Sequence, residues 1–330
     1  MRRFLVLIAG LLAGPALADG AVGFQRVTMP SPAGLTVGVW YPTDAAAPQE
    51  PNTPFRQALA LGAPVAGKDL PLVVISHGNG GWMGGHADLA LALARAGFVV
   101  AAPNHRGDNS EDESASPAEW MVSRPADIRA TIDYLATDWP AAGAVDAETV
   151  GLYGFSSGGY TALAAAGARP DLALARHHCE EDPAEFACRI GIVSGMGDAG
   201  AEADPDAFVA DPRIGAVALA APGLAFAFPA EALATVDVPV ALWSGAADER
   251  VPHATNGAHV AAALPHLTRV TVVPQAGHFA FLAPCNPRLK AFNRRIWDMV
   301  CVDAEGFDRA AFHGELNAAL VAFFEATLRP

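Results

Sequence analysis

Short apolar runs alternate with longer amphipathic segments along most of this chain. The apolar runs have the length and composition of buried parallel strands and lie at residues 72–76, 98–102, 149–153, 214–220, 240–244 and 270–273, with a further strand expected at 35–41. Helical patterns lie at residues 86–96, 125–135, 159–167, 255–264, 288–300 and 309–328. This alternation predicts an α/β protein with a mostly parallel β-sheet flanked by helices.

One long segment interrupts the alternation. Residues 170–212 separate a predicted helix from the next predicted strand and contain the acidic run Glu180-Glu181-Asp182. A connection of this length is typical of a lid over a site. We therefore expect a cap-like insertion at residues 170–212 within a single domain spanning residues 19–330. The alternative is a surface excursion with no role at a site.

The first 18 residues have the three parts of an export signal. Arg2 and Arg3 precede an apolar run, and Ala16-Leu17-Ala18 forms a small-residue cleavage site. The apolar run is shorter than the roughly 20 residues that a membrane-spanning helix needs. We expect cleavage after residue 18 and a periplasmic or secreted protein without a stable membrane anchor.

Composition restricts the possible partners. The chain has 330 residues, 52% of them hydrophobic, which suffices for a large buried core. It carries 21 basic and 35 acidic residues, a formal net charge of −14. Such a charge repels phosphate backbones, so nucleic acid is not an expected partner. The oligomeric state is left open.

Four cysteines in an exported chain predict disulfides, because oxidising compartments let such bonds persist. Three pairings are possible, and proximity favours Cys179 with Cys188 and Cys285 with Cys301. A competing interpretation is a metal site built from residues of ligand type: His177, His178, Cys179 and Cys188. Their spacing matches none of the usual zinc patterns, so no metal is expected.

The strongest chemical motif is Gly154-Phe155-Ser156-Ser157-Gly158, between a predicted strand and a predicted helix. That context is the one in which G-x-S-x-G forms a nucleophile elbow, where a sharp turn exposes the serine hydroxyl above the sheet. Ser156 is the predicted nucleophile. The backbone N–H of Ser157 is a predicted donor to the oxyanion.

A second glycine-rich loop, His77-Gly78-Asn79-Gly80-Gly81, directly follows the strand predicted at 72–76. This is the place of the second oxyanion donor in a fold with such an elbow, and the N–H of Asn79 is the candidate. His77 is expected to shape the loop. Neither residues 78–85 nor residues 62–69 complete a nucleotide-binding motif, so no cofactor is expected.

A serine hydroxyl needs a neighbouring base, most often a histidine oriented by a carboxylate. His278 follows the last predicted strand, whereas the competitors His105, His253 and His259 do not. The chain order serine, acid, histidine of this type of site makes His278 the predicted base.

The acid is predicted in residues 245–252, after the strand at 240–244. Asp248 and Glu249 are both present there, and Asp248 is preferred. Glu249 is interpreted as a solvated neighbour of Arg250. The alternative for Asp248 is a purely structural role, in which it caps a helix that starts near His253.

In these motifs the sequence resembles the α/β-hydrolase superfamily, and more narrowly the predicted dienelactone hydrolases and platelet-activating-factor acetylhydrolase-like esterases. The narrower resemblance rests on Ser76-His77-Gly78-Asn79-Gly80, Pro103-Asn104-His105-Arg106-Gly107-Asp108, Arg124-Pro125-Ala126-Asp127 and the elbow at Ser156. The usual loop of the superfamily also has an Asp at this place that is followed shortly by Val-Pro, as Asp248 is by Val251-Pro252. The resemblance implies hydrolysis of short-chain or lipid-like esters, or of lactones, without a metal or organic cofactor. Dienelactone hydrolases proper typically use a cysteine nucleophile, and this chain has Ser156.

We therefore predict a serine esterase that acts on a small-molecule ester through Ser156, Asp248 and His278. Trp82 and Phe155 are candidate walls of the acyl pocket, with ordinary core packing as the alternative. A serine peptidase or a polyester hydrolase would use the same residues. A catalytically silent hydrolase fold that serves as a binding module is the alternative from another class.

Overall fold

The computed structural model describes residues 20–32, 34–196, 208 and 210–329. The predicted export signal at residues 1–18 lies outside these residues, as do positions 197–207 and 209 of the predicted cap.

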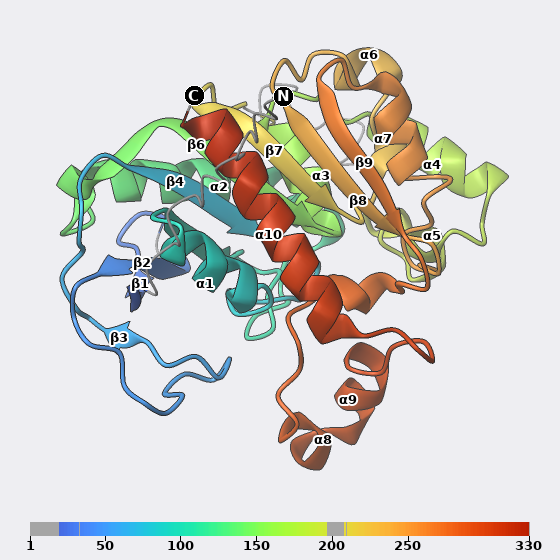
Figure 1. The fold of residues 1–330 in the computed structure, drawn as a ribbon. Helices are drawn as coiled ribbons and strands as arrows, with labels where there is room; N and C mark the ends of the chain where they lie inside the picture. The colour runs from blue at the N-terminus through green and yellow to red at the C-terminus, as the bar shows by residue number, and fades with distance from the viewer. Residues whose placement is uncertain (1–19, 33, 197–207, 209, 330) are drawn as a thin grey trace, which may run out of the picture.

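The described part of the chain forms one nine-stranded sheet with helices on both faces (Figure 1). Its strands are β1 (Ala21–Thr28), β2 (Thr36–Thr43), β3 (Ala60–Leu61), β4 (Leu70–Ser76), β5 (Val99–Asn104), β6 (Val145–Phe155), β7 (Ile214–Ala220), β8 (Val240–Gly245) and β9 (Leu267–Val273). Their order is β3-β1-β2-β5-β4-β6-β7-β8-β9. Strand β2 pairs antiparallel with β1 and β5, and all pairs from β5 to β9 are parallel.

Two apolar layers cover the sheet. The helices are α1 (Ala87–Arg95), α2 (Pro117–Thr137), α3 (Ser157–Ala165), α4 (Leu172–Glu181), α5 (Phe186–Arg189), α6 (Ala230–Leu233), α7 (Gly257–Ala263), α8 (Leu289–Phe292), α9 (Arg294–Val300) and α10 (Arg309–Leu328). Helices α1 and α10 contribute to one core cluster, and α2, α3 and α7 contribute to the other. Figure 1 shows α1 and α10 side by side across one face of the sheet. Because both faces are covered, the central strands are apolar along nearly their whole length.

The predicted α/β architecture is confirmed, but several elements differ from the prediction. The strands β1 and β3 were not expected. Helix α2 begins at Pro117 rather than at 125, because Ser116 and Glu119 form a capping box and proline is favoured in the first turn. The helix expected at 288–300 is two helices, α8 and α9, which meet at Asn293. The backbone of Asn293 is not helical, and its side chain caps α9.

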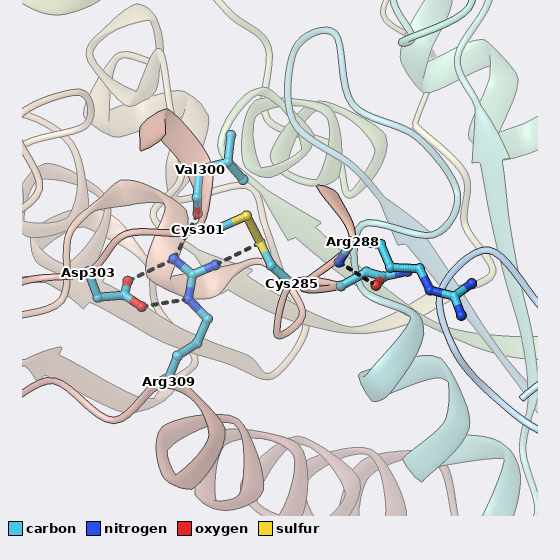
Figure 2. The surroundings of a disulfide bond; sticks show 7 residues. Cys285, Arg288, Val300, Cys301, Asp303 and Arg309 are labelled. Carbon is cyan, nitrogen blue, oxygen red and sulfur yellow. Dashed lines mark hydrogen bonds and ion pairs between the residues drawn. A yellow bond between two sulfur atoms is a disulfide. The ribbon is translucent and has the colours of Figure 1, made fainter. Parts of the chain in front are cut away.

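The structure contains both of the expected local disulfides, Cys179–Cys188 and Cys285–Cys301. Since all four sulfur atoms are paired, none is a thiolate that could bind a metal in this state. Figure 2 shows that Arg309 of α10 packs beside the second bond, with its guanidinium 3.8 Å from Cys285 Sγ and 2.7 Å from Asp303 Oδ1.

Two disulfides are typical of proteins that work in the periplasm or outside the cell. No helix within the described ranges combines the length and the apolar character needed to cross a membrane.

Candidate active site

Ser156 lies at a sharp turn between β6 and α3. Its backbone has φ 55° and ψ −121°, a conformation that costs energy for any residue with a side chain. Both glycines of the motif have a steric cause. A Cβ at Gly154 would overlap the carbonyl oxygen of Gly158, and a Cβ at Gly158 would overlap that of Ser76. The turn therefore has the geometry of a nucleophile elbow.

His278 and Asp248 lie beside this turn in the order expected of a base and its acid. His278 Nε2 is 3.0 Å from Ser156 Oγ, and Nδ1 is 2.8 Å from Asp248 Oδ2. Both side chains are buried. Strands β6 and β8 are parallel members of one sheet, so the loops after them, with Ser156 and Asp248, meet at the same edge. Among the described residues, His278 is the histidine that hydrogen-bonds to Ser156.

Two of the competing histidines, His105 and His259, lie in other contacts. His105 Nε2 is 2.9 Å from Ser76 Oγ, and His259 Nε2 is 2.7 Å from the carbonyl oxygen of Phe228. Glu249 is exposed to solvent.

Asp248 also stabilises its own loop. While Oδ2 faces His278, Oδ1 accepts hydrogen bonds from the backbone N–H groups of Arg250 at 2.9 Å and Val251 at 2.8 Å. The second oxygen therefore orients the carboxylate toward the histidine.

The loop that carries Asn79 is anchored by Asp108, a residue to which no sequence motif gives a role in the site. Asp108 Oδ1 accepts from Asn79 Nδ2 and from the N–H of Gly80, each at 2.7 Å. The side chain of Asn79 is thus engaged with Asp108. Asn79 and Ser157 both line the pocket in front of Ser156.

Asp108 is in turn paired with Arg124, which is fully buried in α2. Arg124 Nη1 is 2.5 Å from Asp108 Oδ2, Nε donates to Thr161 Oγ1 at 3.0 Å, and Nη2 donates to the carbonyl oxygen of His77. Burial lowers the pKa of Arg124, and the charge of Asp108 opposes this shift. These contacts connect the loop after β4 with α2 and α3. Asp108 and Arg124 were identified from the sequence only as part of the family resemblance, because no local pattern indicates that they form a pair.

His77 contributes to the same loop. Its Nδ1 lies 2.7 Å from the carbonyl oxygen of Gly78, and its Nε2 accepts from the N–H of His105 at 3.2 Å. Burial, His105 and the charge of Arg124 together lower the pKa of His77 well below its ordinary range. The ring is therefore neutral and supports the loop from within.

A pocket of about 130 Å³ opens in front of Ser156. Its lining comes from the elbow, the loop at 78–79, the loops of Asp248 and His278, and the predicted cap, which contributes Glu185, Phe186, Ala187, Ile190 and Ile192. Phe155 is part of the wall, with its ring centroid 4.9 Å from that of His278. Trp82 is not among the lining residues and packs near Phe55 instead. The position of Trp82 therefore agrees with the alternative of ordinary core packing.

One group of described side chains has the spacing of a metal site: His178, Asp182 and Glu185, whose ligand atoms lie within 4.8 Å of one another. Glu185 already accepts a hydrogen bond from Thr255 Oγ1 at 2.8 Å. Acidic groups of this kind are common without a metal, and the chemistry of Ser156 and His278 requires none.

Comparisons with known proteins agree with this description. Residues 61–194 match the model of BD-FAE, an esterase family. This range includes Asn79, Asp108, Arg124 and Ser156. The solved structure of a ferulic acid esterase from Streptomyces cinnamoneus is similar to this chain, with a TM-score of 0.60 and 20% identity over 96% of this chain and 92% of that one. No curated protein matches the chain.

The structural likeness shows the fold, which is that of the α/β-hydrolases, as predicted. The family match agrees with the predicted enzyme class, a carboxylic ester hydrolase. The narrower resemblance to dienelactone hydrolases and platelet-activating-factor acetylhydrolase-like esterases stays a prediction.

Proposed function

We propose that this α/β-hydrolase is a serine esterase in which Ser156 is the nucleophile, His278 the general base and Asp248 the acid that orients it. The observation that supports this most directly is the position of His278, with one ring nitrogen 3.0 Å from Ser156 Oγ and the other 2.8 Å from Asp248 Oδ2. The strained backbone of Ser156 is a second support, since such strain is typical of functional residues.

Acylation begins when Ser156 Oγ attacks the ester carbonyl and its proton passes to His278 Nε2. The negative charge that develops on the carbonyl oxygen is stabilised by the backbone N–H groups of Asn79 and Ser157. Asp248 accepts from Nδ1–H and stabilises the imidazolium. The imidazolium then protonates the departing alkoxide, and the alcohol leaves an acyl-serine.

Deacylation repeats these steps with water. His278 removes a proton from the water molecule, the hydroxide attacks the acyl carbonyl, and Ser156 recovers its proton as the carboxylic acid departs. Every proton that His278 accepts is returned, so the cycle needs no cofactor.

The proposed substrate is a small ester with a short or compact acyl group, or a lactone. The size of the pocket, about 130 Å³, and its apolar wall of Phe155, Ile190, Ile192 and Leu224 support this choice. The name of the similar structure makes hydroxycinnamoyl esters a class worth testing. In the proposal, residues 170–212 form a cap over the pocket, and cleavage after residue 18 gives a periplasmic or secreted enzyme.

The test combines a fluorophosphonate probe with ester kinetics on the mature protein. Ser156→Ala should abolish labelling and lower turnover by several orders of magnitude with little change in the fold. Ser157→Ala is the matched control and should have a milder effect, because the proposed role of Ser157 belongs to its backbone.

Graded p-nitrophenyl esters, methyl ferulate, an aminoacyl amide and a polyester film then define the substrate. A clear preference for the amide would replace the esterase with a peptidase, and a preference for the film would indicate a polyester hydrolase. Folded protein with neither labelling nor turnover would be a binding module. Loss of labelling in Ser157→Ala but not in Ser156→Ala would refute the assignment of the nucleophile.

A further inference from the structure

Arg250 is placed unusually for an arginine in this protein. It lines the pocket in front of Ser156, and its guanidinium carbon lies 4.4 Å from the ring centroid of Phe186 and 4.7 Å from that of Phe279. Phe186 belongs to α5 of the predicted cap, and Phe279 directly follows His278. The side chain of Arg250 is therefore positioned by aromatic rings from two segments on either side of the site.

No carboxylate among the described residues is in contact with the guanidinium of Arg250. Within the described residues its guanidinium forms no ion pair and no hydrogen bond. Four other buried or half-buried arginines do have such partners: Arg106 with Asp127, Arg124 with Asp108, Arg213 with Asp211, and Arg309 with Asp303. Arg176 is also half-buried and has no such partner among the described residues, but it does not line the pocket. The absence of a partner stands out in a chain with 35 acidic and 21 basic residues.

The nearest acids are engaged elsewhere. Asp248 uses Oδ2 for His278 and Oδ1 for two backbone N–H groups, as described above. Glu185 lines the same pocket, but its oxygens face Thr255 Oγ1 at 2.8 Å and Asn256 Nδ2 at 3.4 Å. A second positive charge reinforces that of Arg250, since the guanidinium carbon of Arg189 lies 5.7 Å from the ring centroid of Phe186.

A guanidinium that is stacked on aromatic rings keeps its N–H groups in one plane, where they can donate two parallel hydrogen bonds to a carboxylate. Arg250 is half-buried, and this partial burial lowers its pKa, while the charge of the nearby Asp248 opposes the shift without a direct contact. Removing a charge from water without a partner is unfavourable. A ligand that brings a negative charge into the pocket relieves that cost.

We propose that Arg250 is a specificity-determining residue that binds a carboxylate carried by the ester substrate. The substrate class is then an anionic ester, with the carboxylate either on the acyl group or on the alcohol. This inference rests on the proposed esterase function and names the substrate class of the same site.

The test measures discrimination between matched anionic and neutral esters. One pair carries the charge on the alcohol side: 4-(butanoyloxy)benzoate and 4-(butanoyloxy)benzamide. The other pair carries it on the acyl side: 4-nitrophenyl hydrogen adipate and 4-nitrophenyl hexanoate. The wild type should show a higher kcat/KM for the anionic member of one pair, and that pair identifies the side of the ester that bears the carboxylate.

In Arg250→Gln the ratio of anionic to neutral kcat/KM should fall roughly 10- to 100-fold, the size expected for losing charge-assisted hydrogen bonds. Arg250→Lys should lie between the two proteins, because it keeps the charge without the planar fork. Glu185→Gln should raise the ratio, since it removes a negative charge from the same wall. Arg294→Gln is the matched control: Arg294 is exposed in α9, and its loss should leave the ratio unchanged.

Three results would overturn the inference. The wild type could show no anionic preference in either pair, or Arg250→Gln could keep the preference. Equal losses on anionic and neutral esters in Arg250→Gln would mean that Arg250 acts only by supporting Phe186, Phe279 and the loop of Asp248. Failure of the proposed function has a different signature, because the wild type would then neither hydrolyse the neutral esters nor react with the fluorophosphonate probe.

Discussion

The pair of Asp108 and Arg124 allows a sharp test of how the oxyanion loop is supported. In Asp108→Asn one oxygen is replaced by an NH₂ group of nearly the same size. If the NH₂ group takes the place of Oδ2, it faces Arg124 Nη1, which is 2.5 Å from Oδ2 in the wild type, and two donors then oppose each other. If it faces the other way, it meets the donors of Asn79 and Gly80, which now lie at 2.7 Å. Neither orientation of the amide satisfies both sides.

The size of the effect follows from burial. Asp108 is 2% exposed and Arg124 is 0% exposed, so the substitution leaves a buried guanidinium without its partner. Removing one partner of a buried pair typically costs about 3–5 kcal/mol. Asp127 also acts on Arg124 electrostatically, which favours the lower end of that range, about 3 kcal/mol. Loss of the anchor should also displace the Asn79 amide and lower kcat by roughly 10- to 100-fold, with a smaller change in KM.

Urea denaturation measures the free energy of unfolding, and ester kinetics under conditions where the variant is folded measure kcat and KM. Asp112→Asn is the matched control, because Asp112 lies in the same loop but is exposed. Its stability should change by less than about 1 kcal/mol and its kcat should not change. An Asp108→Asn protein as stable and as active as the wild type would refute the idea that this pair supports the loop.

Three further predictions follow from the same structure. Asp248→Asn should lower turnover by roughly 10⁴, as in another triad, whereas Glu249→Gln should have a small effect on the same ester assay. Replacing Cys285 and Cys301 with serine should lower the free energy of unfolding by about 3 kcal/mol, measured by denaturation beside a reduced wild type, and an unchanged stability would contradict this. Burial lowers the pKa of His86 from 6.5 to about 4, so the unfolded chain binds a proton in this range that the folded protein does not. The contribution of His86 to the free energy of unfolding is therefore fully present above about pH 6.5 and should fall by about 3 kcal/mol as the pH drops to 4. His86→Leu should flatten the curve of unfolding free energy against pH.

The parallel strands were predictable because both faces of the sheet are covered. The sequences of β4, β5, β7 and β8 are nearly continuous apolar runs, and the structure places β4 to β9 within a few residues of the predicted ranges. Strand β1 escaped detection because it lies near the edge of the sheet and its buried and exposed positions alternate irregularly. Helix α5 of the predicted cap was missed for another reason: it has four residues, too few to show a helical period.

The candidate site also contains some features that the sequence predicts and others that it does not. The sharp turn at Ser156 was predictable because the steric need for Gly154 and Gly158 produces a motif within five consecutive positions. The pair of Asp108 and Arg124 could not be predicted, since the two residues are separated in the sequence by a loop and part of a helix. Their burial depends on the packing of α2 against α3. Arg250 has no motif either, because its position depends on rings that come from two distant segments.

Asp248 shows how two interpretations of one residue can be separated experimentally. The sequence offered a structural cap or a catalytic acid as alternatives, but in the structure each oxygen of Asp248 has its own contacts: Oδ1 accepts from two backbone N–H groups and Oδ2 faces His278. Asp248→Ala would remove both sets of contacts and could not distinguish them. Asp248→Asn can keep its oxygen on the loop and place its NH₂ group against His278 Nδ1. Nδ1 must then accept, so Nε2 carries the proton and cannot accept one from Ser156. A folded Asp248→Asn protein that loses turnover but keeps its thermal stability would therefore assign the loss to the histidine tautomer rather than to the loop.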